Sequence, residues 1–235
     1  LACEFLDEIA PLKGASYRHI TSQVKYSGTL IFNLDDGELA TLIDPDQYIG
    51  LTESGNILLK NNNLHLEIVC DQERSLHKSG IFDVILESAV TTIVDFEDSA
   101  ATVSDEEKIH GYRNYLGLMK RDLNSTFTKN GHTISRSLNK DKKYIDTNGE
   151  EHTLPGTSLT LVRNVGIHMR TRMVRNLDNS SIPEGIMDAM VTSLIALHDL
   201  KLKINSKKGS VYIVKPKLHG PDAVSYTHLT LPTKA

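Results

Sequence analysis

Charged side chains follow three apolar or β-branched runs of the chain, at the points where strands would end. The first run ends in residues 95–99 (DFEDS), the second in residues 163–164 (RN) and the third in residues 215–220 (KPKLHG). Ligands of parallel α/β sheets bind at the carboxyl ends of the strands, because the loops there converge on one face. We therefore expect these three groups of charges to lie on a common rim.

Arg163 has the chemistry of an anchor for a small oxoacid. A guanidinium presents a rigid fork of donors that can hold a carboxylate in two hydrogen bonds, and it stays charged at any working pH. Asp95 and Glu97 can orient this arginine, or they can bind a divalent cation through water. A structural ion-pair network of the same three side chains is an equally good interpretation, so both stay open at this point.

Other polar residues give weaker signals. By residue type alone, Ser99 is better explained as a cap or loop hydroxyl than as a ligand contact. The histidines at 65, 168 and 198 lack the spacing of metal ligands, and we treat them as structural. Cys3 and Cys70 form neither a zinc motif nor a disulfide framework, so we expect reduced thiols and a cytoplasmic protein. The sequence contains no Walker loop and no dinucleotide-binding fingerprint.

Composition is that of an ordinary globular protein. The 235 residues are 39% hydrophobic and 24% charged, which predicts one or two domains with a sizeable core. The net charge of -4 argues against a protein that coats nucleic acid. We expect no membrane partner, because no apolar run reaches the length of a bilayer span. The chain opens at Leu1 without Met, and we expect it to be cut from something longer.

The elements that would position the charges change character along the chain. Residues 1–86 alternate short β-rich runs with turn signals and predict a small sheet-containing domain. Residues 89–95 form a near-continuous apolar run, typical of a parallel strand covered on both faces. A capping-box pair, Ser104 with Glu107, predicts a helix from there to about Lys120. Residues 121–158 are polar and turn-rich, and we interpret them as an excursion from this pattern.

The alternation then resumes, with a strand expected at 159–164, a helix at 183–203 and a strand at 210–216. Within that helix, apolar residues recur at spacings of three and four and predict one buried face: Met187, Met190, Leu194 and Leu197. Strands that alternate with helices predict a parallel sheet, either open or closed into a barrel.

Six segments follow one another as they do in the malate synthase G family, which the chain resembles up to about Val224. They are residues 56–62 (NILLKNN), 94–99 (VDFEDS), 112–119 (YRNYLGLM), 162–166 (VRNVG), 182–188 (IPEGIMD) and 209–217 (GSVYIVKPK). The chain covers about a third of that family's length. The resemblance implies an α/β fold, a partial TIM (β/α)8 barrel with an inserted α/β domain.

The same resemblance implies the domain organisation. Residues 1–86 and 121–158 would form the inserted domain, while 87–120 and 159–224 would supply barrel strands and helices. Residues 225–235 depart from the family where a helix should follow. We expect them to be a non-native tail, similar to translated adapter sequence, and exclude them from fold reasoning.

Roles for single residues follow only from the resemblance. The family makes malate and CoA from acetyl-CoA, glyoxylate and water, in the glyoxylate cycle. Arg163 matches the arginine that binds glyoxylate and stabilises the enolate oxygen derived from acetyl-CoA. Arg136 and Ser99 match positions that contact acetyl-CoA, which reverses the preference that Ser99 has by residue type.

The acidic cluster has a supporting role in this scheme. Asp95, Glu97 and Asp98 would surround the arginine and the magnesium without being the metal's own ligands. The family uses Mg²⁺ and an aspartate base, and both the metal ligands and the base are expected outside this chain. We therefore expect an isolated chain to be inactive, and the parent protein to be a cytoplasmic monomer without nucleic-acid or membrane partners.

Two alternatives remain. Another TIM-barrel lyase acting on CoA thioesters, of the citrate lyase β type, also joins acidic residues and arginine at a barrel rim. The expected inserted domain and residues 163–166 (RNVG) favour malate synthase over this lyase. The second alternative is a non-catalytic stub that at most binds CoA.

Overall fold

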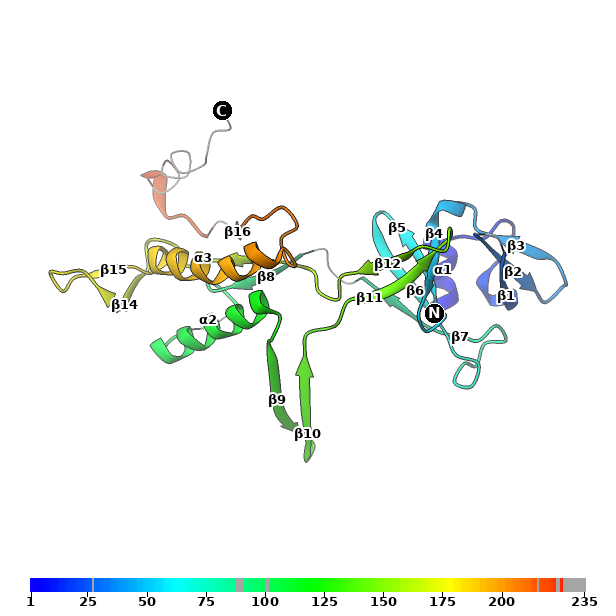
Figure 1. Ribbon diagram of the computed structural model, residues 1–235, viewed down its shortest axis with the longest axis horizontal. Coiled ribbons are helices and arrows are strands. Elements are labelled where there is room, and N and C mark those ends of the chain that lie inside the picture. The colour runs from blue at the N-terminus through cyan, green and yellow to red at the C-terminus, as the bar shows by residue number, and fades with distance from the viewer. Residues whose placement is uncertain (27, 88–90, 100–101, 215, 223–224, 226–235) are drawn as a thin grey trace. The chain divides into compact units, whose positions relative to one another are not determined.

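The computed structural model describes residues 1–235 except 27, 88–90, 100–101, 215, 223–224 and 226–235. The chain divides into two compact units, which are described separately below and whose elements are labelled in Figure 1. Unit 1 consists of Leu1–Val90 and Lys140–Gly156, and unit 2 of Thr91–Asn139 and Thr157–Ala235. Within the described residues, none of the helices is long and apolar enough to cross a membrane.

Unit 1 begins with one helix and a small antiparallel sheet of order β1-β2-β3. The elements are α1 (Ala2–Ile9), η1 (Tyr17–His19), β1 (Ile20–Tyr26), β2 (Thr29–Leu34), β3 (Leu39–Thr41) and η2 (Pro45–Gln47). Tyr17 joins them, because its ring packs edge-on against Phe32 and its hydroxyl donates a hydrogen bond to the carbonyl of Ala10. A buried aromatic with a satisfied hydroxyl stabilises a core without leaving an unpaired polar atom.

The larger sheet of unit 1 has six strands in the order β12-β11-β4-β5-β6-β7, all antiparallel. The strands are β4 (Tyr48–Thr52), β5 (Ile57–Asn61), β6 (Leu64–Cys70), β7 (Ile81–Leu86), β11 (Lys142–Asp146) and β12 (Glu151–Leu154). Gly50 of β4 has a φ of 145°, and a Cβ there would overlap the carbonyl oxygen of Ile145. Glycine at this position therefore lets β11 approach β4.

Unit 2 contains the parallel sheet that the sequence predicts. Its order is β16-β13-β8, and both pairings are parallel. The elements are β8 (Thr91–Asp95), α2 (Asp105–Lys120), β13 (Leu159–Arg163), α3 (Glu184–Leu202) and β16 (Ile213–Val214). The described strands do not close into a barrel. Each helix connects two neighbouring strands of this sheet, which is the βα alternation expected from the apolar runs.

The start of α2 confirms the predicted capping box. The Ser104 hydroxyl accepts a hydrogen bond from the backbone of Glu107, and the Glu107 carboxylate accepts one from the backbone of Ser104. Helix α2 ends where Arg121 adopts a left-handed conformation. The cap therefore fixes where the helix begins, soon after the acidic cluster at the end of β8.

Two hairpins complete unit 2. They are β9 (Asn124–Lys129) with β10 (His132–Ser137), and β14 (Arg170–Arg175) with β15 (Ser181–Pro183). By contacts the first hairpin lies in unit 2, whereas the sequence-based scheme places all of 121–158 in the inserted domain. A hairpin bonded mainly to itself makes few contacts with either domain, so the boundaries expected from the sequence stay a prediction.

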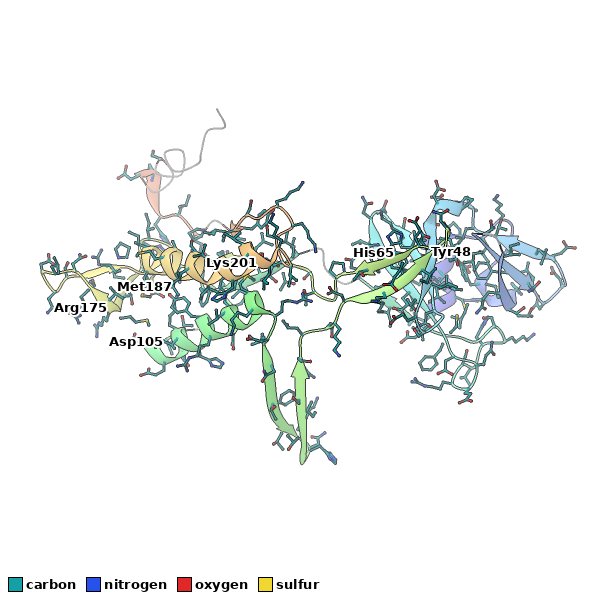
Figure 2. All side chains as sticks on the ribbon, in the orientation of Figure 1. Tyr48, His65, Asp105, Arg175, Met187 and Lys201 are labelled. Atoms are coloured by element: carbon teal, nitrogen blue, oxygen red, sulfur yellow. The ribbon has the colours of Figure 1, made fainter. Side chains whose placement is uncertain are left out.

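The buried face of α3 differs from the one expected from its apolar spacing. Met187 is buried, but Met190 and Leu194 are 70% and 67% exposed, and Leu197 is also exposed. Helix α3 buries instead a mixed stripe of Gly185, Met187, Asp188, Thr192, Ile195, Ala196 and Asp199. The prediction was wrong because the helix carries two stripes, and the polar residues of the inner one have partners in α2 and the loops. Figure 2 shows Met187 on α3 and Asp105 at the start of α2.

Candidate active site

Arg163 and Asp95 are the last residues of two neighbouring parallel strands, β13 and β8, and they are register partners. Two hydrogen bonds join their side chains: Nε of Arg163 donates to Oδ1 of Asp95 at 2.9 Å, and a terminal nitrogen donates to Oδ2 at 2.6 Å. This is the fork-to-fork geometry in which guanidinium and carboxylate bind most strongly. The sequence-based expectation that both groups share a rim is confirmed.

Three further charged residues, Glu97, Asp98 and Lys217, contact this pair or one another. Asp98 accepts a hydrogen bond from Arg163 at 2.6 Å, and a Glu97 oxygen lies 3.5 Å from the other terminal nitrogen of Arg163. Lys217 follows β16; its ammonium donates to Asp98 at 2.6 Å and its backbone N–H donates to Glu97 at 3.0 Å. All three strand ends therefore contribute to one cluster, which we call the rim cluster: Asp95, Glu97, Asp98, Arg163 and Lys217.

The backbone after β8 directs the carboxylates. Oδ1 of Asp95 accepts hydrogen bonds from the backbone N–H groups of Glu97 and Asp98, at 2.9 and 3.2 Å. An aspartate that binds the backbone two residues ahead forms a turn, which ends the strand. The sequence motif thereby turns the chain so that all three carboxylates face Arg163.

These contacts keep the cluster ionised. Hydrogen bonding from Arg163 lowers the pKa of Asp95 to about 2, and the bond from Lys217 lowers the pKa of Asp98. In return, Asp95 raises the pKa of the Arg163 guanidinium, and Asp98 raises that of the Lys217 ammonium. Within the Asp95–Arg163 and Asp98–Lys217 pairs, each partner therefore favours the charged form of the other.

Arg163 is partly exposed although its side chain faces three carboxylates. Its side chain is 22% exposed, and the terminal nitrogen beside Glu97 has a carboxylate only at 3.5 Å, beyond good hydrogen-bond distance. Asp95 holds the opposite edge in both of its bonds. The geometry shows the ion-pair network, one of the two interpretations that the sequence left open, and the binding of an anion by Arg163 stays a prediction.

The two residues expected to contact acetyl-CoA lie outside these bonds. Ser99 is exposed in the turn that follows the acidic cluster. Arg136 is exposed on β10, with its guanidinium 5.1 Å from the centre of the Phe127 ring. Neither has a described bond to Arg163, so their roles remain a prediction.

Lys217 is the residue that the sequence reasoning named least clearly. It was one of several charges expected after the third strand, with no signal to separate it from its neighbours. Its bonds to Asp98 and Glu97 depend on residues 119 and 120 positions earlier in the chain. Only the expectation of a common rim pointed toward this contact.

The described acidic residues at the rim do not suit a magnesium ion by themselves. Every carboxylate of the rim cluster already faces a guanidinium, an ammonium or a backbone N–H. Mg²⁺ requires several oxygen ligands in near-octahedral geometry. In the described part of the chain, Asp146, Glu150 and His152 of the β11–β12 hairpin are a group of possible ligand side chains, and they belong to unit 1.

Family models match part of each unit. A family model described as the malate synthase TIM barrel domain matches residues 159–229, and one described as the malate synthase G alpha-beta insertion domain matches residues 1–61. Malate synthase G of Halalkalibacterium halodurans is 45% identical over 237 residues, which cover 97% of this chain and 33% of the relative. The chain is a homologue of malate synthase G.

Two other malate synthase G sequences are also similar to this chain. Those of Corynebacterium efficiens and Corynebacterium glutamicum are 43% and 42% identical, and each alignment covers 96% of this chain. The chain spans about a third of the length of the curated malate synthase G relatives it matches. The fold class expected from the sequence is confirmed: an insertion domain with part of a TIM barrel, whose described strands do not form a closed barrel.

Proposed function

We propose that this chain supplies the glyoxylate-binding arginine of a malate synthase, which condenses acetyl-CoA with glyoxylate and water to give malate and CoA. The observation that supports the proposal is Arg163, held at the strand ends by two hydrogen bonds to Asp95, with a side chain that is 22% exposed. The terminal nitrogen beside Glu97, which has no close hydrogen bond among the described residues, would donate to the carboxylate of glyoxylate and to the oxygen of the acetyl-CoA enolate. Preorganised donors aimed at developing negative charge are a large source of rate in enzymes.

The rim cluster would prepare Arg163 for this role. Asp95 and Asp98 restrict the guanidinium, so little reorganisation is needed when an anion arrives. Lys217 holds Asp98 and Glu97 from the third strand end. Arg136 and Ser99 would contact acetyl-CoA from exposed positions. We propose further that the base and the magnesium ligands lie outside this chain, and that the parent enzyme is a cytoplasmic monomer.

The test uses a chimera in which residues 1–222 of this chain replace the matching segment of the Halalkalibacterium halodurans malate synthase G. Thiol release from acetyl-CoA is measured with magnesium, with and without glyoxylate. We expect release that depends on glyoxylate, and a loss of at least about a hundredfold for Arg163→Ala, the scale of removing a transition-state donor.

The matched control is Arg175→Ala. Arg175 lies on the β14–β15 hairpin (Figure 2) and is exposed, and the described hydrogen bonds of its side chain go to Asn179. It should leave the rate unchanged. A folded chimera that binds acetyl-CoA but releases no thiol with glyoxylate would contradict the proposal. That outcome would favour the lyase alternative, because such a lyase breaks a carbon–carbon bond of a CoA thioester and frees no thiol.

A further inference from the structure

A buried ionic network lies beneath the rim, between α2 and α3. The Lys108 ammonium is 2.7 Å from a Glu184 oxygen and 2.8 Å from Oδ1 of Asp188, and these contacts are ion pairs whose angles fall outside hydrogen-bond geometry. The Tyr112 hydroxyl donates to the same Asp188 oxygen at 2.5 Å. The side chain of Asp188 is fully buried and that of Lys108 is 3% exposed.

This network is bonded to the residues that follow Arg163. Oδ2 of Asp188 accepts a hydrogen bond from the backbone N–H of Val165 at 2.8 Å. The side chain of Asn164, directly after Arg163, accepts one from Thr192 of α3 at 3.2 Å. Both residues after the arginine are therefore fixed by side chains of one helix.

The chain after Asp95, at the end of β8, contacts the same network. The Phe96 ring, directly after Asp95, packs against the Tyr112 ring at 5.2 Å, and the Lys108 ammonium lies 4.9 Å from its centre. The Phe96 backbone N–H donates to the carbonyl of Arg163. The network thus contacts the chain immediately after each member of the Arg163–Asp95 pair.

Stability alone does not explain such a network. Removing charges from water is costly, and a buried ion pair is often no more stable than apolar side chains of the same volume. Close approach also fixes α3 here, because a Cβ on Gly185 would overlap the Val165 carbonyl oxygen. Three charged side chains and a glycine therefore set the position of one loop, the loop that follows Arg163. We interpret the positioning of this loop as their role.

We propose that Asp188, charged and held by Lys108 and Tyr112, is a positioning residue that fixes the backbone after Arg163 and thereby the direction of its guanidinium. This inference rests on the proposed function of Arg163. Asp188 touches no substrate in this scheme. Its effect is transmitted through the Val165 N–H to the two residues that follow β13, Asn164 and Val165.

The experiment compares Asp188→Asn with Asp199→Asn in the chimera. Asp199 is also buried in α3 and accepts three backbone hydrogen bonds, from Ile204, Asn205 and Ser206, at the opposite end of the helix from Val165. Asp188 accepts two hydrogen bonds and pairs with Lys108, and Asp199 accepts three, so either variant replaces a buried carboxylate by an amide with one acceptor oxygen. Only Asp188→Asn should lower kcat, by about tenfold to a hundredfold, the scale of misplaced catalytic geometry. The KM for acetyl-CoA should not change.

Hydrogen exchange adds a measurement that needs no activity. Exchange in the peptide containing Val165 should accelerate in Asp188→Asn and not in Asp199→Asn. Tyr112→Phe removes only one hydroxyl and should fold more readily than Asp188→Asn. It should also lower kcat, by a smaller factor than Asp188→Asn. Equal kcat values for the two asparagine variants, or unchanged Val165 exchange in Asp188→Asn, overturn the inference. An inactive wild-type chimera contradicts the proposed function instead, and exchange at Val165 still decides whether Asp188 holds the loop.

Discussion

Asp95 and Arg163 face each other as register partners at the ends of β8 and β13, and two hydrogen bonds of 2.9 and 2.6 Å join their side chains. The pair links two strand ends whose residues are 68 positions apart. Because the pair lowers the pKa of Asp95, it also makes the stability of the fold depend on pH.

Asp95→Asn should change how the free energy of unfolding depends on pH. The pKa of Asp95 is lowered from 3.8 to about 2, first of all by the hydrogen bond from Arg163. A lowered pKa in the folded state means stability that is present above about pH 4 and is lost as the pH falls toward 2. Urea unfolding from pH 2 to 6 should show a wild-type advantage over Asp95→Asn that shrinks through this window. A constant difference would contradict the assignment.

Lys108→Met should destabilise unit 2 strongly. It leaves the buried carboxylate of Asp188 and the half-buried one of Glu184 without their cation, and breaking a buried ion pair costs about 3–5 kcal/mol. Lys201→Met, at the exposed end of α3 in Figure 2, is the matched control and should change stability by less than about 0.5 kcal/mol. Both are measured by urea denaturation, and similar midpoints for the two variants would show that Lys108 is not paired as described.

Helix α3 should make the chain self-associate through its exposed apolar stripe. Met190 and Leu194 are 70% and 67% exposed, and apolar side chains so placed favour association. The double variant Met190→Lys with Leu194→Lys should reduce the associated fraction in sedimentation velocity without lowering the unfolding midpoint. Met187→Lys, which buries a charge, should unfold unit 2 instead. Unchanged association in the double variant would contradict this prediction and indicate that the chain associates through its open strand edges.

The chain by itself should release no thiol from acetyl-CoA in the presence of glyoxylate and magnesium. The proposed base and metal ligands lie outside it, and Arg163 alone does not remove a methyl proton. The chimera described above is the positive control in the same assay. Glyoxylate-dependent release by the isolated chain would mean that these roles are filled by residues within it.

The rim cluster shows what a sequence can predict. Charges that follow apolar runs fall at strand ends, and the parallel pairing of β8 with β13 then brings Asp95 and Arg163 together. This required only strand positions and the parallel arrangement. The capping box at Ser104 was predictable for a similar reason, because its bonds are local.

The buried network was not predictable. Lys108 follows three acidic residues in the first turn of a polar helix and looks solvent-exposed. Its partners Glu184 and Asp188 lie in a helix reached only after three hairpins and strand β13. The exposed face of α3 was missed because spacing shows that a stripe is apolar without showing what covers it. The roles of Arg163, Arg136 and Ser99 come from the resemblance to malate synthase G and remain predictions.

The division of unit 1 into Leu1–Val90 and Lys140–Gly156 has a consequence for biosynthesis. A ribosome makes β4 early, but its neighbour β11 emerges only after α2 and the β9–β10 hairpin of the other unit. Until then the edge of β4, with Gly50 shaped to receive β11, is unpaired in the nascent chain. The unit that begins first is completed only after part of the second has been made, so translation speed through residues 91–139 sets how long that edge stays open to other strands.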